Sequence, residues 1–309
     1  MSGPGDLAGV SRCVLCGKPA VTRVRNPDRH LCDDHFIHFF EERVFRTITD
    51  GKMVRPGDRI AIALSGGKDS TALLLVLSRL LPAWDDVHPV AITIDEGIAG
   101  YRQETLRAAR ELTACHKIEH HIISFRELFE RDLDQILLGR EHRACTICGI
   151  LRKKALVVAA ERYGATKIAT GHNLDDEAQS VLMNALRGDM PRLIRDATRE
   201  NPGFLLRIKP LSLTPEREIA LYLMLRDAWT ELPECPYTRF ALRAEVRGML
   251  SKLEYRHPGT MLHLIDAKKK IERYCAGAPA PAAIRRCREC GDPCSGELCQ
   301  VCRLRHSLG

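Results

Sequence analysis

Residues 59–70 read RIAIALSGGKDS, and this stretch decides the fold. The apolar run RIAIAL predicts a buried strand, and TALLLVLSRLL at 71–81 predicts a buried helix directly after it. The six residues between them, from Ser65 to Ser70, therefore form a turn from strand to helix. Backbone N–H groups at such a helix start, with the helix dipole behind them, form a binding site for anions.

The residue types in this turn suit a phosphate ligand. Gly66 and Gly67 have no side chains that would keep phosphate oxygens away from the backbone. Ser65 and Ser70 add hydroxyl donors, and Lys68 adds a fixed positive charge. The sequence therefore predicts that this turn binds the phosphates of a nucleotide.

Asp69 distinguishes this turn from the Walker A loop. That loop has Ser or Thr after its lysine, whereas here Asp69 follows Lys68. A carboxylate beside phosphates can help to hold Mg²⁺, or it can orient the start of the helix. The structural alternative is a tight turn with an aspartate cap and no ligand.

The chain around this turn alternates between strands and helices. Further strands are expected at 88–95, 117–124, 165–170 and 207–211, and helices at 101–114, 125–139, 145–164 and 175–188. Strands separated by helices of this length predict a parallel sheet that is covered on both faces. The expected fold class is therefore α/β, and the chain after Pro215 is expected to be helical.

The composition predicts a cytoplasmic protein without membrane segments. The 309 residues are 45% hydrophobic and 28% charged, so a packed core is expected. No uncharged apolar run approaches the roughly 20 residues that span a bilayer. The N-terminal MSGPGDLAGVSRC lacks the basic start and apolar stretch of a secretory signal. The net charge of +7 weakly favours an anionic partner such as nucleic acid.

Thirteen cysteines are the unusual feature of the composition. Their odd number excludes complete disulfide pairing within the chain, and clustered cysteines in a cytosolic chain indicate metal binding or catalysis. Two sets have the paired spacing of closed tetrahedral zinc sites. The first set is Cys13, Cys16, Cys32 and His35, and the second is Cys287, Cys290, Cys299 and Cys302.

These two sets divide the chain into segments. We expect an N-terminal zinc-finger module in residues 1–50, with a helix over 34–49, and the α/β domain in 51–215. Residues 216–276 are expected to be a helical extension that completes this domain. A linker rich in Pro and Ala then precedes a C-terminal zinc finger at 284–309.

A third pair, Cys145 and Cys148, lies at the start of an expected helix, where the helix dipole favours thiolates. The pair is incomplete as a zinc site, and Cys235 is the nearest plausible third ligand. Three cysteines suit a [4Fe–4S] cluster with one iron open to a further ligand. The residues alone also allow a redox-active cysteine pair, or a structural zinc with a fourth ligand other than cysteine.

A resemblance to known families narrows these alternatives. The string SGGKDS resembles the phosphate loop of the PP-loop ATP pyrophosphatases, with their adenine nucleotide alpha hydrolase-like fold, which cleave ATP between the α and β phosphates and transfer AMP to a substrate oxygen. The order of the motifs is similar to that of the cytosolic and archaeal tRNA 2-thiouridine synthetases. Those motifs are the Cys/His knuckle, SGGKDS, DEGIAGYR, CTICGILRKKAL, TGHNLDDEAQSVLMNALRGD, ECPY and the terminal four-cysteine finger.

The resemblance implies roles for residues at the matching positions. In that family, three cysteines matching Cys145, Cys148 and Cys235 hold a [4Fe–4S] cluster, whose open iron is thought to bind the sulfur delivered to tRNA. A basic residue matching Arg152, and an aspartate matching Asp175 or Asp176, are linked to catalysis there, as Asp69 is expected to be here. Gly171 and His172 follow an expected strand at its carboxyl end, where ligands bind in such sheets, so they are expected at the ATP site.

The resemblance also implies the reaction. ATP with Mg²⁺ adenylates the C2 oxygen of a tRNA uridine, with the wobble uridine as the expected target, and sulfur then displaces AMP. The expected partners are tRNA and a sulfur donor, either sulfide or a ubiquitin-like thiocarboxylate carrier, and members are often homodimers. The alternatives are a persulfide on Cys148 or Cys235 without a cluster, a T-loop uridine as the target, and a zinc-finger RNA-binding adaptor with a decayed ATP site.

Overall fold

The computed structural model describes residues 11–25, 27–193, 205–233, 235–237, 242–275, 285–294 and 296–308. The expected linker between the helical extension and the C-terminal finger lies outside these residues. Within them, no helix is long and apolar enough to cross a membrane.

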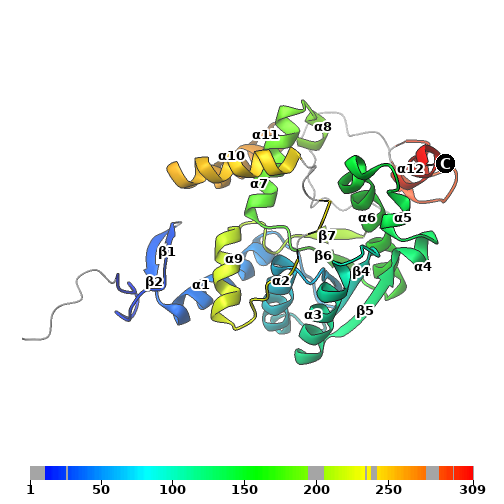
Figure 1. The fold of residues 1–309 in the computed structure, drawn as a ribbon. Coiled ribbons are helices and arrows are strands. Elements are labelled where there is room, and N and C mark those ends of the chain that lie inside the picture. The colour runs from blue at the N-terminus through cyan, green and yellow to red at the C-terminus, as the bar shows by residue number, and fades with distance from the viewer. Residues whose placement is uncertain are drawn as a thin grey trace, which may run out of the picture.

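A parallel sheet of five strands lies at the centre of the molecule, in the order β5-β4-β3-β6-β7 (Figure 1). Its strands are β3 (Arg59–Ala63), β4 (His88–Asp95), β5 (Glu119–Ser124), β6 (Lys167–Ala169) and β7 (Leu206–Ile208). The chain runs outward from β3 through β4 to β5, and then returns to the other side of β3. The strand order therefore reverses beside β3, and ligands bind at the carboxyl ends of strands at such a reversal.

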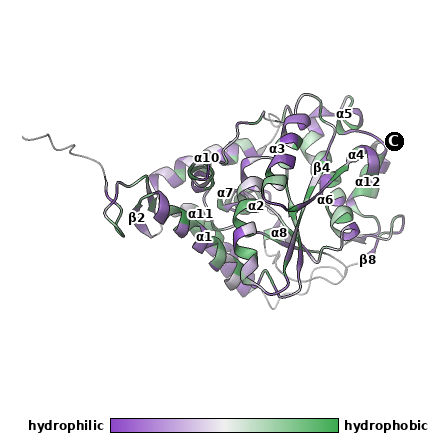
Figure 2. Ribbon diagram, turned by 90° about the horizontal axis from the view of Figure 1, so that it is seen from below, coloured by the Kyte–Doolittle hydropathy of each residue, from purple (hydrophilic) through white to green (hydrophobic). Residues whose placement is uncertain are grey.

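Helices cover both faces of this sheet, which confirms the predicted α/β fold. Ile60 and Ile62 of β3 pack with α2 (Lys68–Leu80), α1 (Asp33–Asp50) and α9 (Glu216–Leu225). Ala61, between them, packs on the opposite face with α6 (Ala144–Arg162). Both faces are apolar because alternate residues of a strand point to opposite sides, and Figure 2 shows β4 in the colour of hydrophobic residues.

The remaining helices connect and extend this core. They are α3 (Arg102–Cys115), α4 (Phe125–Phe129), α5 (Leu133–Ile136), α7 (Leu174–Leu186), α8 (Met190–Leu193), α10 (Leu242–Arg256) and α11 (Thr260–Tyr274), with short 3₁₀ turns at Leu81–Ala83 and Glu141–Arg143. Helices α10 and α11 pack against α7 through Val246, Leu250 and Met261. In the described part of residues 216–276, the secondary structure consists of helices α9, α10 and α11, as the sequence predicts.

The helix expected over 125–139 is interrupted. Helix α4 ends where Glu130 adopts a left-handed conformation with φ of 62°, and α5 begins again behind a capping box at Asp132. A non-glycine residue at positive φ ends the regular helical bonding. The loop between the two helices lies beside β4, since the N–H of Leu133 donates to the carbonyl of Glu96 at 2.8 Å.

The two cysteine-rich modules lie at opposite ends of the molecule (Figures 1 and 2). The first consists of the hairpin β1 (Thr22–Arg25) and β2 (Asp28–Leu31) with the start of α1. The second consists of β8 (Arg285–Arg286), β9 (Pro293–Cys294) and α12 (Gln300–Leu308). Phe40 of α1 stacks on Tyr222 of α9 at 4.1 Å, and Leu304 of α12 is buried in the core cluster that contains α6. Both modules are therefore packed on the central domain.

Candidate active site and metal centres

The turn after β3 has the geometry of an anion site. Gly67 caps helix α2, and Gly66 has a φ of +88°, which favours glycine. A Cβ atom at Gly66 would lie 2.4 Å from the carbonyl oxygen of Thr105, so a side chain has no room there. The Ser70 hydroxyl donates to the Gly67 carbonyl at 2.8 Å and accepts from the Ser65 N–H at 3.2 Å. The hydroxyl of Ser70 therefore stabilises the conformation of the loop.

Lys68 and Asp69 form a charged group with a partner that the sequence analysis missed. The Lys68 ammonium lies 2.9 Å from an Asp69 carboxylate oxygen and 2.7 Å from one of Glu216, at the start of α9. Burial alone would lower the pKa of Lys68, but the two carboxylates outweigh it and raise the pKa. Asn173 donates to the other Asp69 oxygen at 3.0 Å. Two carboxylates therefore hold Lys68 in its charged form.

Gly171 and His172 lie at the end of β6, beside this loop. A Cβ atom at Gly171 would lie 3.0 Å from the Asp69 backbone, so the two segments are in close contact. His172 shares a hydrogen bond with the Thr170 hydroxyl at 2.8 Å. Burial and the nearby Lys209 lower the pKa of His172, so the ring is neutral at pH 7.

The two candidate aspartates at the start of α7 have different partners. Asp175 accepts the backbone N–H of Glu216 at 2.8 Å, and burial raises its pKa. Asp176 forms a capping box with Asn173 and an ion pair with Arg243 of α10 at 3.2 Å. Asp175 is therefore linked through Glu216 to the lysine of the loop, whereas Asp176 joins α7 to α10.

The three cysteines of the expected cluster site come together from two segments. Cys148 is buried and Cys145 is exposed at the start of α6. The Cys145 thiol donates to the carbonyl of Tyr237 at 3.6 Å, two residues after Cys235. Cys235 and Tyr237 pack against the hydrophobic cluster that contains Cys148. Although 86 residues separate Cys148 from Cys235 in the sequence, the two cysteines adjoin the same buried cluster.

The spacing of these thiols argues against a single zinc ion. In a tetrahedral zinc site, ligand sulfurs about 2.3 Å from the metal lie about 3.8 Å apart. Within the described part of the chain, the cysteine groups whose ligand atoms all lie within 4.8 Å of one another do not include Cys145, Cys148 and Cys235. A four-iron cluster spreads its thiolates over different irons and so holds them farther apart. These three residues therefore fit a cluster better than a zinc ion.

The terminal sets do have the dimensions of zinc sites. The ligand atoms of Cys13, Cys16, Cys32 and His35 lie within 4.8 Å of one another, as do those of Cys287, Cys290, Cys299 and Cys302. Sulfur–sulfur distances of 3.7 Å in the first set and 3.6 Å in the second match the edge of a zinc tetrahedron. Backbone N–H groups at Cys299 and Cys290 lower the pKa of Cys287 to about 6, which favours the thiolate that zinc requires.

Cys294 lies outside the second set, as expected from its position between the paired ligands. Its thiol donates to the carbonyl of Gly296 at 3.0 Å. Cys294 is buried like most of the ligands, but its thiol bonds the backbone and it does not belong to the group of four ligand atoms.

The basic residues of CTICGILRKKAL have three different surroundings. Arg152 donates to the Cys148 sulfur at 2.9 Å, and its Nε lies 2.8 Å from Glu96. Lys154 pairs with Asp292 of the C-terminal module at 2.6 Å. Partial burial together with the nearby Arg207 and other cations lowers the pKa of Lys153. Arg152 therefore contacts the cysteine site, Lys154 joins the central domain to the C-terminal module, and Lys153 belongs to a basic surface.

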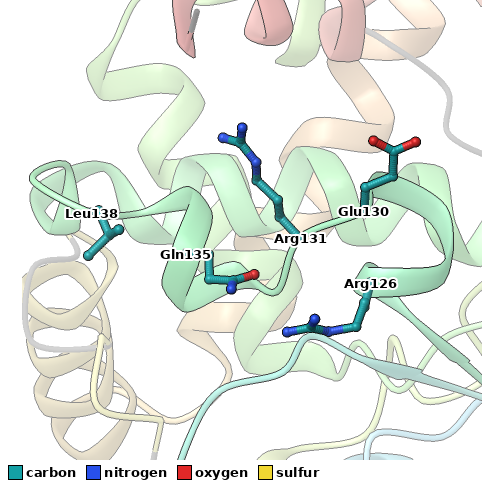
Figure 3. A pocket seen from close by; sticks show the side chains of 5 residues that line it. All are labelled: Arg126, Glu130, Arg131, Gln135 and Leu138. Atoms are coloured by element: carbon teal, nitrogen blue, oxygen red, sulfur yellow. The ribbon is translucent and has the colours of Figure 1, made fainter.

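A separate open hollow of about 320 Å³ lies at α4 and α5 (Figure 3). It is lined by Arg126, Glu130, Arg131, Gln135 and Leu138, and none of these is a predicted site residue. Arg126, which lines this hollow, is exposed and forms an ion pair with Asp132. We therefore regard the hollow as part of the solvated surface.

Comparison with known proteins decides the family. A family model described as a PP-loop domain matches residues 38–252, and one described as the N-terminal LIM domain of the 2-thiouridine synthetase TtuA matches residues 12–37. The chain is 35% identical to the tRNA 2-thiolation protein NcsA of Haloferax volcanii, over 96% of this chain and 98% of the relative. The chain belongs to the tRNA 2-thiolation protein family.

Other members of this family agree with that assignment. The cytoplasmic tRNA 2-thiolation protein 1 of Bos taurus is 37% identical, over 96% of this chain and 88% of the relative. The U34-tRNA thiolase NcsA from Methanococcus maripaludis, solved with its [4Fe–4S] cluster, superposes with a TM-score of 0.84 at 30% identity and covers 96% of both chains. The family and fold predicted from the motifs are therefore confirmed, and the roles of individual residues remain predictions.

Proposed function

We propose that this chain is an ATP-dependent tRNA sulfurtransferase that converts the wobble uridine to 2-thiouridine. The observation that carries the proposal is that three side chains, Arg102, Glu96 and Arg152, connect the backbone of the phosphate loop to the three-cysteine site. Ser65 of the loop contacts Arg102, and Cys148 contacts Arg152, and both arginines lie at Glu96. Relatives named tRNA 2-thiolation proteins, and a structure named a U34-tRNA thiolase, support the choice of substrate.

In the first step, the loop Ser65–Ser70 binds the phosphates of ATP, with Gly171 and His172 at its side. Asp69 would hold Mg²⁺, which would supply positive charge to screen the leaving pyrophosphate. The C2 oxygen of uridine attacks the α phosphorus, the bond to the β-phosphate oxygen breaks, and pyrophosphate leaves. The product of this step is an adenylated uridine in which C2 is open to a nucleophile.

In the second step, sulfur attacks C2 and AMP leaves with the original oxygen. Cys145, Cys148 and Cys235 would hold a [4Fe–4S] cluster, which supplies an open coordination position for the sulfur that is transferred. Arg152 stands beside Cys148 with its side chain 51% exposed, so its guanidinium can also stabilise the departing AMP. Asp175 or Asp176 completes the proposed catalytic set, and Asp175 is the better placed because Glu216 links it to Lys68.

A basic surface beside the loop suits the backbone of tRNA. Lys153 of α6 and Arg207 of β7 are in contact, since Arg207 donates to the Lys153 carbonyl at 3.4 Å. Lys209 and Arg243 lie close enough to affect the pKa of both Lys153 and His172. Phosphate groups of RNA would relieve the repulsion among these cations.

The proposal includes the wider organisation of the protein. Residues 1–50 and 284–309 are zinc modules, 51–215 the catalytic domain and 216–276 its helical extension. The protein acts in the cytoplasm as a homodimer, and its sulfur comes from sulfide or from a ubiquitin-like thiocarboxylate carrier. The relatives named cytoplasmic support the compartment.

The test is thiolation in vitro with the anaerobically reconstituted protein, ATP, Mg²⁺, sulfide and unmodified tRNA. Mass spectrometry of the nucleosides, with site mapping, is expected to find 2-thiouridine at the wobble position. Detection of 2-thiouridine in the T-loop would show that the target is a T-loop uridine. Activity in protein that lacks iron and acid-labile sulfide would favour the persulfide route. If the protein shows neither ATP–pyrophosphate exchange nor thiolation, the proposed enzymatic function is wrong and an RNA-binding adaptor is favoured.

A further inference from the structure

A buried carboxylate lies between the phosphate loop and the cysteine site. Glu96 directly follows β4, and its side chain is 5% exposed. One of its oxygens lies 2.8 Å from Nε of Arg102, and the other lies 2.8 Å from Nε of Arg152. The N–H of Arg102 Nε is not aligned with the oxygen, so this contact is an ion pair without a hydrogen bond.

Each arginine continues to one of the two sites. Arg102 donates from Nη1 to the carbonyl of Ser65 in the phosphate loop at 3.1 Å. Arg152 donates from Nη2 to the sulfur of Cys148 at 2.9 Å. Three side chains therefore form one unbroken path of contacts from the nucleotide loop to a proposed cluster ligand.

The backbone between Glu96 and Arg102 is shaped for this arrangement. Gly97 and Gly100 both adopt a φ of +70°, so the chain turns sharply between β4 and α3. A Cβ atom at Gly97 would lie 2.5 Å from the Asp132 carboxylate, so the turn is also closely packed. This turn brings Arg102, at the start of α3, back over the carboxylate of Glu96. Glu96 and Arg102 both belong to the DEGIAGYR segment, and the sequence alone assigns a role to neither of them.

Burial makes Glu96 the main charge partner of Arg102. Arg102 is 4% exposed, its other carboxylate partner, Asp95, lies farther away at 3.9 Å from Nε, and a buried charge that loses its nearest partner is destabilised. Arg152 is half exposed, so Glu96 holds its Nε while part of the guanidinium stays accessible. Because both arginines lie 2.8 Å from oxygens of one buried carboxylate, Glu96 limits how far apart they can lie.

We propose that Glu96 is a positioning residue that holds the ATP loop and the cluster cysteine Cys148 in register. The inference rests on the proposed function, because sulfur must meet the same carbon whose oxygen has received AMP. Such reactions tolerate only small errors in the placement of the reacting groups. Since Glu96 touches both arginines, nucleotide binding and cluster retention are coupled through it, and each stabilises the other to the same extent.

The experiment compares Glu96→Gln with Glu127→Gln in the full-length protein. Gln is isosteric with Glu but removes the charge that Glu96 shares between two arginines. Glu127 pairs with Arg162 on the surface of the same domain, so its variant removes one ion pair outside the path. Two quantities are measured: the dissociation constant for ATP in the cluster-free protein, and the half-time of iron loss to a chelator in the reconstituted protein.

We expect Glu96→Gln to weaken ATP binding about fivefold and to shorten the half-time of iron loss about tenfold. ATP should also slow iron loss in the wild type and in Glu127→Gln but not in Glu96→Gln. A Glu96→Gln protein that matches Glu127→Gln in either quantity, or that keeps the effect of ATP on iron loss, overturns the proposal.

Glu96→Asp keeps the test decisive if Glu96→Gln does not fold. Its carboxylate is one methylene shorter, so it cannot reach both arginines at once, and the effect of ATP on iron loss should again disappear. Persistence of that effect would overturn the proposal. If the wild type binds ATP and iron but makes no 2-thiouridine, the proposed function fails while these binding measurements still decide the role of Glu96.

Discussion

At the scale of single residues, the proposed nucleotide binding depends most on the charge of Lys68. Its ammonium is shared between Asp69 and Glu216 at 2.9 and 2.7 Å. In the proposed function, the polyphosphate of ATP carries more negative charge than either carboxylate and binds at this helix start. Lys68 would then face the phosphate charge, and Asp69 would face the metal ion that accompanies it.

Lys68→Ala and Asp69→Ala should therefore each lower ATP–pyrophosphate exchange and tRNA thiolation by at least about 100-fold. Both variants should still fold, because both side chains are partly exposed and contribute their charge rather than core packing. Circular dichroism and zinc content provide the check on folding. Lys18→Ala, which removes a surface pair with Asp34, is the control and should stay fully active. Wild-type thiolation in either loop variant would show that the loop is misassigned.

His120 gives a second prediction at this scale, on stability. Its ring nitrogens contact the hydroxyls of Thr93 at 2.8 Å and Thr113 at 3.1 Å, and burial, with Arg110, lowers its pKa to about 4. The unfolded chain binds this proton near pH 6.5, so the stabilisation is complete above that pH and is lost as the pH falls toward 4.

Replacing His120 with Asn removes this titration. Urea unfolding at pH 7.5 should show the variant less stable than the wild type, because packing around the ring is lost. At pH 5 the difference should shrink by about 2 kcal/mol, since only the wild type takes up a proton on unfolding. A difference that does not change with pH would contradict the lowered pKa.

At the scale of helices and strands, local patterns were sufficient for most of the core but not for the contacts between segments. Strands such as β3 and β4 are readable because their apolar runs are continuous and bounded by turn residues. The break at Glu130 comes from a residue with a left-handed conformation, which the apolar periodicity of 125–139 does not show. Glu96 and Glu216 were missed because Arg152 and Lys68, with which they pair, lie far away in the sequence.

The cysteine sites were predictable because ligand spacing is itself a local pattern. Cys235 was less certain, because the residues alone named it only as the nearest plausible third ligand and the resemblance to the family was needed to choose a cluster over the alternatives. Arg152 could be singled out in the same way, but its contact with a buried carboxylate could not. Sequence therefore gave the groups that carry chemistry, and the structure adds the residues that hold them in place.

The C-terminal module yields a prediction at this scale. Cys299→Ser should remove the zinc of this module and lower the Tm by about 5 °C or more, because a structural zinc contributes directly to folding. The iron chromophore should persist, since Cys299 belongs to a different metal site. Cys294→Ser is the matched control, because Cys294 is buried in the same module but bonds the Gly296 carbonyl. Full zinc occupancy in Cys299→Ser would refute the assigned ligands.

At the scale of the whole molecule, the two zinc modules lie at opposite ends of the α/β domain (Figure 1). The C-terminal module is fixed to α6 by Leu304 and by the pair between Lys154 and Asp292. Helix α6 begins with the cysteine pair, so its placement also places Cys145 and Cys148. Cys235 packs against the same cluster of buried residues, which contains Cys148.

This convergence leads to the prediction that tests the whole arrangement. Ser at Cys145, Cys148 or Cys235 should remove iron, acid-labile sulfide and thiolation together, while ATP binding persists. The physical reason is that each cysteine is one of three ligands, so the loss of any one leaves a site that cannot retain a cluster with an open position. Cys115→Ser is the control, because Cys115 is exposed at the end of α3 and belongs to neither metal module.

Iron analysis, anaerobic absorbance and nucleoside mass spectrometry on the same preparations separate the competing chemistries. A persulfide route would need only the cysteine that carries the sulfur and the one that resolves it, so one of the three serine variants would stay active without iron. A cluster route requires all three residues equally, which their common neighbourhood around Arg152 favours. A fully active Cys235→Ser enzyme would therefore refute the three-ligand cluster, even though Cys235 lies beside the pair.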